Sequence, residues 1–359
     1  MRKRILATVL AAGMAVSLAA CGGGSNGGAT EAAKTEAAKT EAAKTEAAKT
    51  EETKAEGETK AEAEAPASDW KPSTTISIVV PASAGGTTDL SARVWAQYAK
   101  DLGFDAVVVN AGGASGSVAA NQVLDAAADG CTVLYGHNLV NVANIAGVTD
   151  YNYTAFKLGP TFCLEPAQQL YASAAKYKDW NDFVEQAKAN PGKLMACTEV
   201  GAYTYYELLG LEVAAGIDLD LVDVGSNSEK IAALLGGQVD LMPGAYGNAK
   251  DYVESGDFVC LGVPTADRYE TVADLPTMKE QGVDYVYPDC EFSFYFPKDT
   301  PDEVIAAYEA VTKQLTENPD VIESLNNLAM VPKYLNAADS EANDAKIFKQ
   351  LEEIAATVK

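Results

Sequence analysis

The sequence contains a single histidine, His137, among its 359 residues. One imidazole offers no zinc site, because no two cysteines have the C-x-x-C spacing that would supply the other ligands. No G-x-S-x-G motif lies between a predicted strand and a predicted helix, and the glycine-rich loop 110–117 lacks the order G-x-G-x-x-G. A serine or cysteine nucleophile near His137 is the enzyme alternative that stays open. We expect no catalytic residue, no metal and no cofactor.

Positive charge is also scarce, because 27 lysines and arginines face 51 acidic residues and leave a net charge of −24. A chain this acidic repels nucleic acid and anionic lipid head groups, so neither is an expected partner. It also repels an anionic ligand at long range. An anion site on this protein must therefore work through local geometry rather than through a basic field.

The sequence has no apolar run of the roughly 20 residues that a permanent membrane-spanning helix needs. The shorter run from Ile5 to Leu18 follows Arg2-Lys3-Arg4 and ends in L-A-A-C, which predicts a secretory signal peptide over residues 1–20. The L-A-A-C tetrapeptide resembles the bacterial lipobox, which implies cleavage before Cys21 and lipidation of its thiol. A free cysteine after an ordinary cleavage site is the alternative. We expect an extracytoplasmic protein that is held at the cell membrane only by this lipid.

Residues 21–70 are predicted to form a tether. A Gly/Ser/Asn stretch over 22–28 is followed by repeats of T-E-A-A-K over 30–49, a composition typical of a partly helical spacer. No apolar stripe runs along the repeats, so they have nothing to bury.

Lipidation of Cys21 would leave five cysteines, which cannot all pair with one another. The sequence favours buried free thiols, with one disulfide as the alternative. These cysteines are Cys131, Cys163, Cys197, Cys260 and Cys290.

Beyond the tether, strands and helices alternate, which predicts an α/β fold with parallel sheets covered by helices. A first series has strands at 76–80, 106–109 and 131–135, with helices at 89–100 and 118–127. A second series begins near Tyr171, with helices at 180–189, 203–215 and 228–235 and strands at 193–197, 219–224, 239–242 and 258–263. The chain then returns to the first series through a strand at 292–296 before its terminal helices. We therefore expect two lobes: lobe 1 from residues 71–170 and 293–359, and lobe 2 from residues 171–292.

Two loops leave a strand and enter a helix, one over 81–89 and one over 197–202. In open α/β sheets ligands bind at this edge. Gly85 and Gly86 permit close approach of the backbone, and the helix start behind them offers free N–H groups to an anion. A carboxylate is the expected guest, and the alternative is that the glycines only turn the chain while Thr88 caps the helix.

The domain resembles the substrate-binding proteins of tripartite tricarboxylate transporters, the Bug family. The resemblance rests on an ordered set of segments that covers essentially all of residues 72–359. These are ISIVVPASAGGTTDLSAR (76–93), VVVNAGGASGS (107–117), DGCTVLYG (129–136), ANPGKL (189–194), AAGIDL (214–219), LLGGQVDLM (234–242) and RYETVADLPTMKEQG (268–282).

The resemblance implies a two-lobed, periplasmic-binding-protein-like (type II) α/β fold with a ligand cleft between the lobes. It also implies a monomer that captures a small carboxylate-bearing solute and passes it to integral-membrane transporter subunits. Backbone amides and bridging water from both loops would hold the carboxylate. Carried over by position, the ligand-binding residues are Ala82, Ser83, Gly85, Gly86, Thr87 and Asp89 in lobe 1, and Thr198, Val200, Gly201 and Ala202 in lobe 2. Asp89 has the alternative role of a helix N-terminal anchor, and the loop 110–117 is expected to flank the pocket.

The sequence departs from the family at Thr87, Glu199, Gly244 and Glu291, where relatives carry Gly, Gly, Asp and Trp. Glu199 and Glu291 in a partly dry cleft would each need a partner, which predicts a ligand with a cationic or hydrogen-bond-donating group, such as a zwitterion. The alternative is that both side chains point into solvent. His137, at the same sheet edge, could contact ligand or only pack.

Two further functions compete with the carboxylate receptor. One is a receptor of another transporter class for amino acids or other solutes, and the second is a surface lipoprotein with no transport role.

Overall fold

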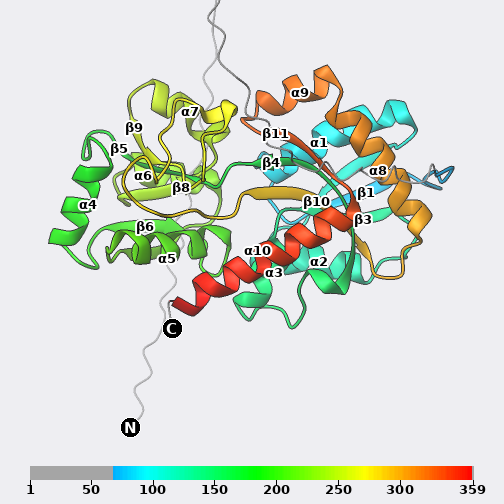
Figure 1. Cartoon of the computed structure of the whole chain (residues 1–359), viewed down its shortest axis with the longest axis horizontal. Helices are drawn as coiled ribbons and strands as arrows, with labels where there is room; N and C mark the ends of the chain where they lie inside the picture. The colour runs from blue at the N-terminus through cyan, green and yellow to red at the C-terminus, as the bar shows by residue number, and fades with distance from the viewer. Residues whose placement is uncertain (1–67, 358–359) are drawn as a thin grey trace, which may run out of the picture. The chain divides into compact units, whose positions relative to one another are not determined.

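The computed structural model describes residues 68–357, which form two α/β lobes built on separate sheets (Figure 1). The sheet of lobe 1 has six strands in the order β11-β4-β10-β3-β1-β2, and the sheet of lobe 2 has five in the order β7-β6-β8-β5-β9. The predicted signal peptide, Cys21 and most of the tether lie outside the described residues.

Lobe 1 begins with three parallel strands, of which β1 and β3 are buried apolar runs typical of a sheet covered on both faces, while β2 at the edge is partly exposed. Antiparallel β10 then lies between β3 and β4. The strands are β1 (Ile76–Val80), β2 (Ala106–Asn110), β3 (Thr132–Gly136), β4 (Phe156–Glu165), β10 (Cys290–Pro297) and β11 (Val331–Leu335). The helices are α1 (Thr87–Ala99), α2 (Ser117–Leu124), α3 (Leu139–Ile145), α8 (Asp302–Thr316), α9 (Pro319–Asn326) and α10 (Ala337–Thr357).

Lobe 2 repeats this pattern, with parallel pairs β6–β7 and β6–β8 and antiparallel β5 between β8 and β9. Its strands are β5 (Gln169–Ser173), β6 (Met195–Thr198), β7 (Asp220–Asp223), β8 (Leu241–Gly244) and β9 (Phe258–Gly262). Its helices are α4 (Trp180–Ala189), α5 (Tyr203–Ala215), α6 (Asn227–Leu235) and α7 (Tyr246–Glu254).

The chain crosses between the sheets at residues 166–168 and again in the segment 263–289. The predicted boundaries at 170/171 and 292/293 were therefore two to three residues late, because β5 already begins at Gln169 and β10 at Cys290. Helix α10, assigned by sequence to lobe 1, packs on β4 and α3 of that lobe and also on α5 of lobe 2 (Figure 1).

An aromatic cluster forms the core of lobe 1. The rings of Trp95 and Tyr308 stack with centroids 5.6 Å apart, and Phe104 meets Tyr308 edge-on at 5.4 Å. Trp70, predicted to belong to the tether, packs on Phe104 with centroids 5.9 Å apart. The receptor domain thus begins by residue 70, because this indole buries its apolar surface on the lobe.

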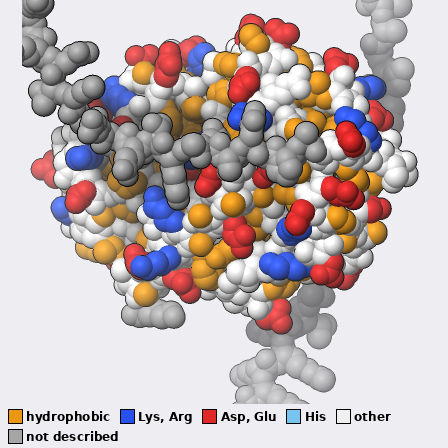
Figure 2. All heavy atoms as spheres, turned by 45° about the vertical axis from the view of Figure 1, so that its right-hand side comes forward, with side chains coloured by type: hydrophobic (Ala, Val, Ile, Leu, Met, Phe, Trp, Pro, Cys, Tyr) orange, Lys and Arg blue, Asp and Glu red, His pale blue; other side chains and the backbone are white. Residues whose placement is uncertain are grey.

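The surface of this domain mixes both signs of charge. Figure 2 shows lysines and arginines interspersed with the acidic side chains on one face, where hydrophobic side chains gather only in small groups. Within residues 68–357, no helix has both the length and the apolar character needed to cross a bilayer.

The five predicted cysteines are all free thiols, four of them buried and Cys260 partly so. The prediction of unpaired thiols is confirmed. Burial raises the pKa of Cys163 and Cys260 to about 12, which leaves both thiols protonated and unreactive at neutral pH.

Candidate functional site

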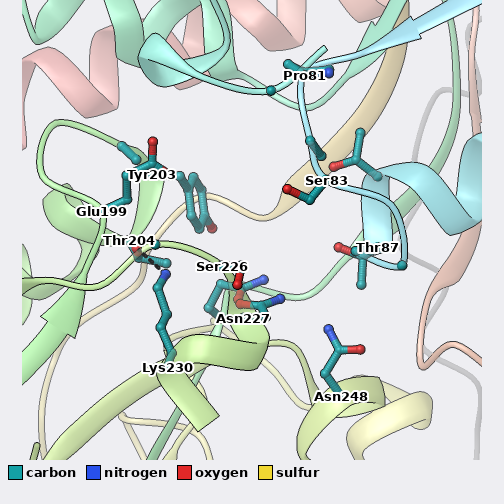
Figure 3. Close-up of a pocket in the computed structure, with 18 of the residues that line it drawn as sticks. Pro81, Ser83, Thr87, Glu199, Tyr203, Thr204, Ser226, Asn227, Lys230 and Asn248 are labelled. Carbon is teal, nitrogen blue, oxygen red and sulfur yellow. Dashed lines mark hydrogen bonds between the residues drawn. The ribbon is translucent and has the colours of Figure 1, made fainter. Parts of the chain in front are cut away.

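A cavity of about 690 Å³ lies where the strand ends of both lobes meet. It is lined from lobe 1 by the loop after β1, the loop after β2 and the residues after β3. From lobe 2 it is lined by the loop after β6 and by the starts of α5, α6 and α7. Figure 3 shows Ser83 and Thr87 on one side of the space and Tyr203 and Thr204 on the other. This size is typical of a site for one small molecule.

The loop after β1 is held in a fixed shape by Asp89. Its Oδ2 accepts the N–H of Gly85 at 2.9 Å, its Oδ1 accepts Nδ2 of Asn110 at 3.0 Å, and Arg93 pairs with it at 2.8 Å. Burial alone would raise the pKa of Asp89, but the hydrogen bonds from Arg93, Gly85 and Asn110 outweigh it and lower the pKa. Asp89 does not line the cavity. These contacts match its alternative role as the anchor of the loop, and a contact between Asp89 and ligand stays a prediction.

Helix α1 begins at this loop without a side-chain cap. Gly86 occupies the N-cap position in an extended conformation, and no side chain accepts the N–H groups of the first turn. These N–H groups have no acceptor within the helix, and they carry the positive end of its dipole. Gly86 and Thr87 both line the cavity, so this helix end is available to a guest.

The loop after β6 brings a second helix end to the opposite wall. Helix α5 also starts without a side-chain cap, at Ala202. Ala202 and Glu199 line the cavity, and Glu199 is exposed at its rim. Thr198, Val200 and Gly201 do not line it, so their role as ligand contacts stays a prediction.

A different local feature accounts for the absence of each of these three residues from the cavity wall. The hydroxyl of Thr198 is buried against Oγ1 of Thr204 at 2.7 Å. Val200 is 51% exposed on the outside of the turn. Gly201 has φ +77°, and a Cβ there would lie 3.3 Å from Cβ of Ala146. The turn needs this glycine for its backbone conformation rather than for close approach of a ligand.

A buried lysine from α6 reaches the same wall. Lys230 is only 5% exposed, and its Nζ lies 3.4 Å from Oγ1 of Thr204 (Figure 3). Burial lowers the pKa of Lys230, while nearby Cys197, Glu199, Glu207 and Asp223 oppose that shift. A cation lines the cavity at a position that the sequence analysis did not single out.

A buried carboxyl lines the cavity at the crossover between the lobes. Oε2 of Glu165, the last residue of β4, accepts Oγ1 of Thr87 at 3.1 Å and Nε2 of Gln168 at 3.0 Å. Burial raises the pKa of Glu165 to about 7, against hydrogen bonds from Thr87 and Gln168 that lower it. Through these two hydrogen bonds, the carboxyl of Glu165 links the loop after β1 to the crossover segment at residues 166–168, which we call the hinge.

His137 lines the cavity between aromatic rings. Its ring meets Tyr203 and Phe292 edge-on with centroids 5.3 and 5.5 Å away, and Nδ1 is hydrogen-bonded to Oδ1 of Asn138 at 2.8 Å. Burial lowers its pKa to about 4, so the imidazole is neutral at neutral pH. Within residues 68–357, no three His, Cys, Asp or Glu side chains gather as metal ligands would.

Glu291 lies outside the cavity, and its role as a ligand contact stays a prediction. Its Oε1 pairs with Nζ of Lys333 at 2.7 Å, and its Oε2 accepts Nδ2 of Asn343 at 2.8 Å. Successive side chains of a strand point to opposite faces, so Cys290 lines the cavity and Glu291 does not. Because Lys333 supplies a cation to Glu291, this carboxylate needs no cationic group on the ligand.

The cavity brings together most of the predicted ligand-binding residues. Those that line it are Ala82, Ser83, Gly85, Gly86, Thr87, His137, Glu199 and Ala202. The loop 110–117 flanks the cavity as expected, through Gly112, Gly113, Ser115 and Gly116. Polar residues that line the cavity and were not predicted from the sequence include Glu165, Gln168, Tyr203, Thr204, Ser226, Lys230 and Asn248. The loop 225–227, between a predicted strand and a predicted helix, was a signal that could have found Ser226 and Lys230.

Comparison with known proteins identifies the family. The model of the tripartite tricarboxylate transporter family receptor matches residues 91–354. This chain belongs to that family. It is 31% identical over 294 residues to the UPF0065 protein in the gbd 5' region of Cupriavidus necator, which covers 79% of this chain and 87% of that protein.

Solved structures of the receptor family share the fold. The periplasmic binding protein BugD has 26% identity and a TM-score of 0.72, over 80% of this chain and 98% of that one. MatC from Rhodopseudomonas palustris, solved with bound malate, has 25% identity and a TM-score of 0.71, over 79% and 99%. The fold is therefore the two-lobed type II form, and the protein is an extracytoplasmic solute-binding receptor.

Proposed function

We propose that this receptor captures a small carboxylate-bearing solute in its cavity, catalyses no reaction and delivers the solute to the integral-membrane subunits of a transporter. One observation carries the proposal. Helices α1 and α5 begin without side-chain caps, and residues of both first turns line the same cavity from different lobes. Uncapped helix starts favour an anion, and a guest held by both would draw the lobes together.

The charge of the protein makes this local arrangement necessary. With a net charge of −24, the chain attracts no anion at long range. The free N–H groups at the two helix starts bind an anion at hydrogen-bond distance, whereas salt screens its repulsion by the exposed carboxylates of the surface. The malate bound to the relative MatC supports a carboxylate as the guest.

A screen by thermal unfolding tests the proposal. We expect at least one mono-, di- or tricarboxylic acid to stabilise the protein by about 2.7 kcal/mol at a hundredfold excess over Kd. The methyl ester of the same acid is the matched control, and it should give no shift because it has lost the anionic oxygens that the N–H groups bind. A clear shift from a sugar or a peptide, with none from any acid, would refute the carboxylate proposal.

The same screen separates the two alternatives. Stabilisation by amino acids but not by matched acids would indicate a receptor of a different ligand class. The absence of any stabilising solute would indicate a surface lipoprotein without a transport role.

We also propose that the protein is anchored to the membrane by a lipid on Cys21, which lies outside the described residues. The sequence L-A-A-C at 18–21 supports this proposal. A Cys21→Ser variant expressed in its host should move from the membrane fraction to the soluble extracytoplasmic fraction, because a serine offers no thiol to acylate. Unchanged membrane association of that variant would contradict the anchor.

A further inference from the structure

We infer that Lys230 and Thr204 form a second anion subsite in lobe 2, which makes the receptor select solutes with two anionic groups over those with one. This inference rests on the proposed function, in which the uncapped start of α1 receives the first carboxylate. The subsite concerns the far end of the ligand.

The position of Lys230 lowers the stability of the protein when no ligand is bound. It is the fourth residue of α6, near the positive end of the helix dipole, where a cation is destabilising. It is also 5% exposed, although lysine is almost never fully buried without a partner. Among residues 68–357 no carboxylate lies within ion-pair distance of its Nζ, and its hydrogen bond to Thr204 is long at 3.4 Å.

The acidic residues around Lys230 do not neutralise it. Glu199 and Asp223 are exposed, so water screens their charges. Glu207 is buried, neither of its carboxyl oxygens accepts a hydrogen bond, and burial raises its pKa well above the ordinary value. Lys230 therefore faces the cavity as a desolvated amine whose counter-ion is not supplied by the neighbouring side chains.

Thr204 adds further donors at the same place. It is the second residue of α5, so its backbone N–H has no acceptor within the helix. Its Oγ1 lies 2.7 Å from Oγ1 of Thr198. It also lies 3.4 Å from Nζ of Lys230, which points toward Thr204 in Figure 3. An ammonium group, a hydroxyl and a helix start thus converge on one wall. A carboxylate bound there would supply the anion that the buried lysine lacks.

Glu199 lines the rim of the same wall and would repel a second carboxylate. Its exposure limits that repulsion, because charges in water interact weakly. Lys230 lies inside the wall, where the attraction is less screened. The balance favours an anion over the ammonium group that Glu199 by itself suggested.

Binding of three ligand types tests the subsite. Unbranched dicarboxylates from malonate to adipate are compared by calorimetry with the monocarboxylate and the ω-amino acid of equal chain length. We expect the wild type to bind the best dicarboxylate at least about tenfold tighter than its monocarboxylate. Lys230→Met should weaken the dicarboxylate by about tenfold to a hundredfold, the worth of a charged hydrogen bond, and should leave the monocarboxylate within about threefold.

Two variants control for the loss of a buried side chain. Lys230→Arg keeps the charge and should keep the preference for the dicarboxylate. Lys250→Met removes a half-exposed lysine of α7, which pairs with Glu254 at 3.6 Å, and should change no affinity. If Lys230→Met does not fold, Thr204→Val removes a donor from the subsite and should lower the same preference.

The outcomes separate this inference from the proposed function. Binding of monocarboxylates by the wild type reports on the anion site at the start of α1. The ratio of dicarboxylate to monocarboxylate affinity reports on the subsite formed by Lys230 and Thr204. Equal losses for both acids in Lys230→Met, an unchanged ratio, or preference for the ω-amino acid would overturn the subsite while the receptor function stands. Failure of every acid to bind the wild type would overturn both.

Discussion

Gly86→Val is expected to lower the affinity for every carboxylate by about a hundredfold, with little change in the unfolding temperature. Gly86 is the N-cap residue of α1 and lines the cavity, so a branched side chain there would keep a carboxylate away from the N–H groups of the first turn. The fold tolerates the side chain for two reasons. The backbone of Gly86 is extended with φ −78°, and an added Cβ would lie 3.5 Å from the carbonyl oxygen of Ser83, an ordinary contact.

Gly85→Ala is the matched control in the same loop. Gly85 has φ +86° with no atom near an added Cβ, so this change strains the backbone without adding much bulk. It should lower stability, whereas Gly86→Val should lower affinity. Thermal unfolding and calorimetry of both variants measure the two effects. Normal carboxylate binding by Gly86→Val would show that the loop is only a turn.

The free energy of unfolding without ligand is expected to fall by several kcal/mol as the pH rises from about 5 to about 8. Burial raises the pKa of Glu165 from 4.5 to about 7 and that of Asp344 from 3.8 to about 7. In this range the folded state holds protons that the unfolded state has released, so stability falls with increasing pH. Each carboxyl contributes on the order of 3 kcal/mol, and the fall ends once the pH has passed the folded pKa values.

Isosteric amides test which carboxyls are responsible. Asp344 accepts a hydrogen bond from Nδ2 of Asn141 at 2.6 Å on one oxygen and from the hydroxyl of Tyr295 at 2.8 Å on the other, so Asp344→Asn keeps its size and removes its titration at the cost of one acceptor. Glu165→Gln does the same at the hinge. Each variant should flatten the pH dependence, and the double variant should flatten it more than either single one, while Glu207, whose pKa burial also raises, retains part of the fall. Carboxyls with a lowered pKa, such as Asp89, lose stability only at more acidic pH. Urea unfolding at several pH values gives the curve, and a flat wild-type curve would contradict the burial argument.

Elements with strong local signals were predicted closely from the sequence. The helices 180–189 and 203–215 have the predicted bounds, because a capping Asp179 and the stop signals at Asn190 and Gly216 mark their ends. The strand β1 was also predicted exactly, because it is a short β-branched run that ends at a proline.

Other elements gave no usable local pattern. The strand β4 is almost wholly buried over ten residues, so it lacks the alternation of polar and apolar residues that indicates a strand. The strand β11 contains a proline and is only partly buried, and it is ordered by pairing with β4. The helices α3 and α7 are short and follow strands at the ligand edge, and no element was predicted for either segment.

The sequence alone determined an α/β fold with two glycine-containing loops at a sheet edge, because strand–helix alternation and helix starts are local properties of sequence. The receptor function was implied by the resemblance to a family. Only the tertiary structure decided which side chains meet in the cavity. Glu165 and Lys230 lie 65 positions apart and come from different lobes, and their burial changes their charge behaviour. Glu291, next to a residue that lines the cavity, is turned away and paired with Lys333. Burial and pairing depend on contacts between distant segments, and these contacts exist only once both lobes have folded.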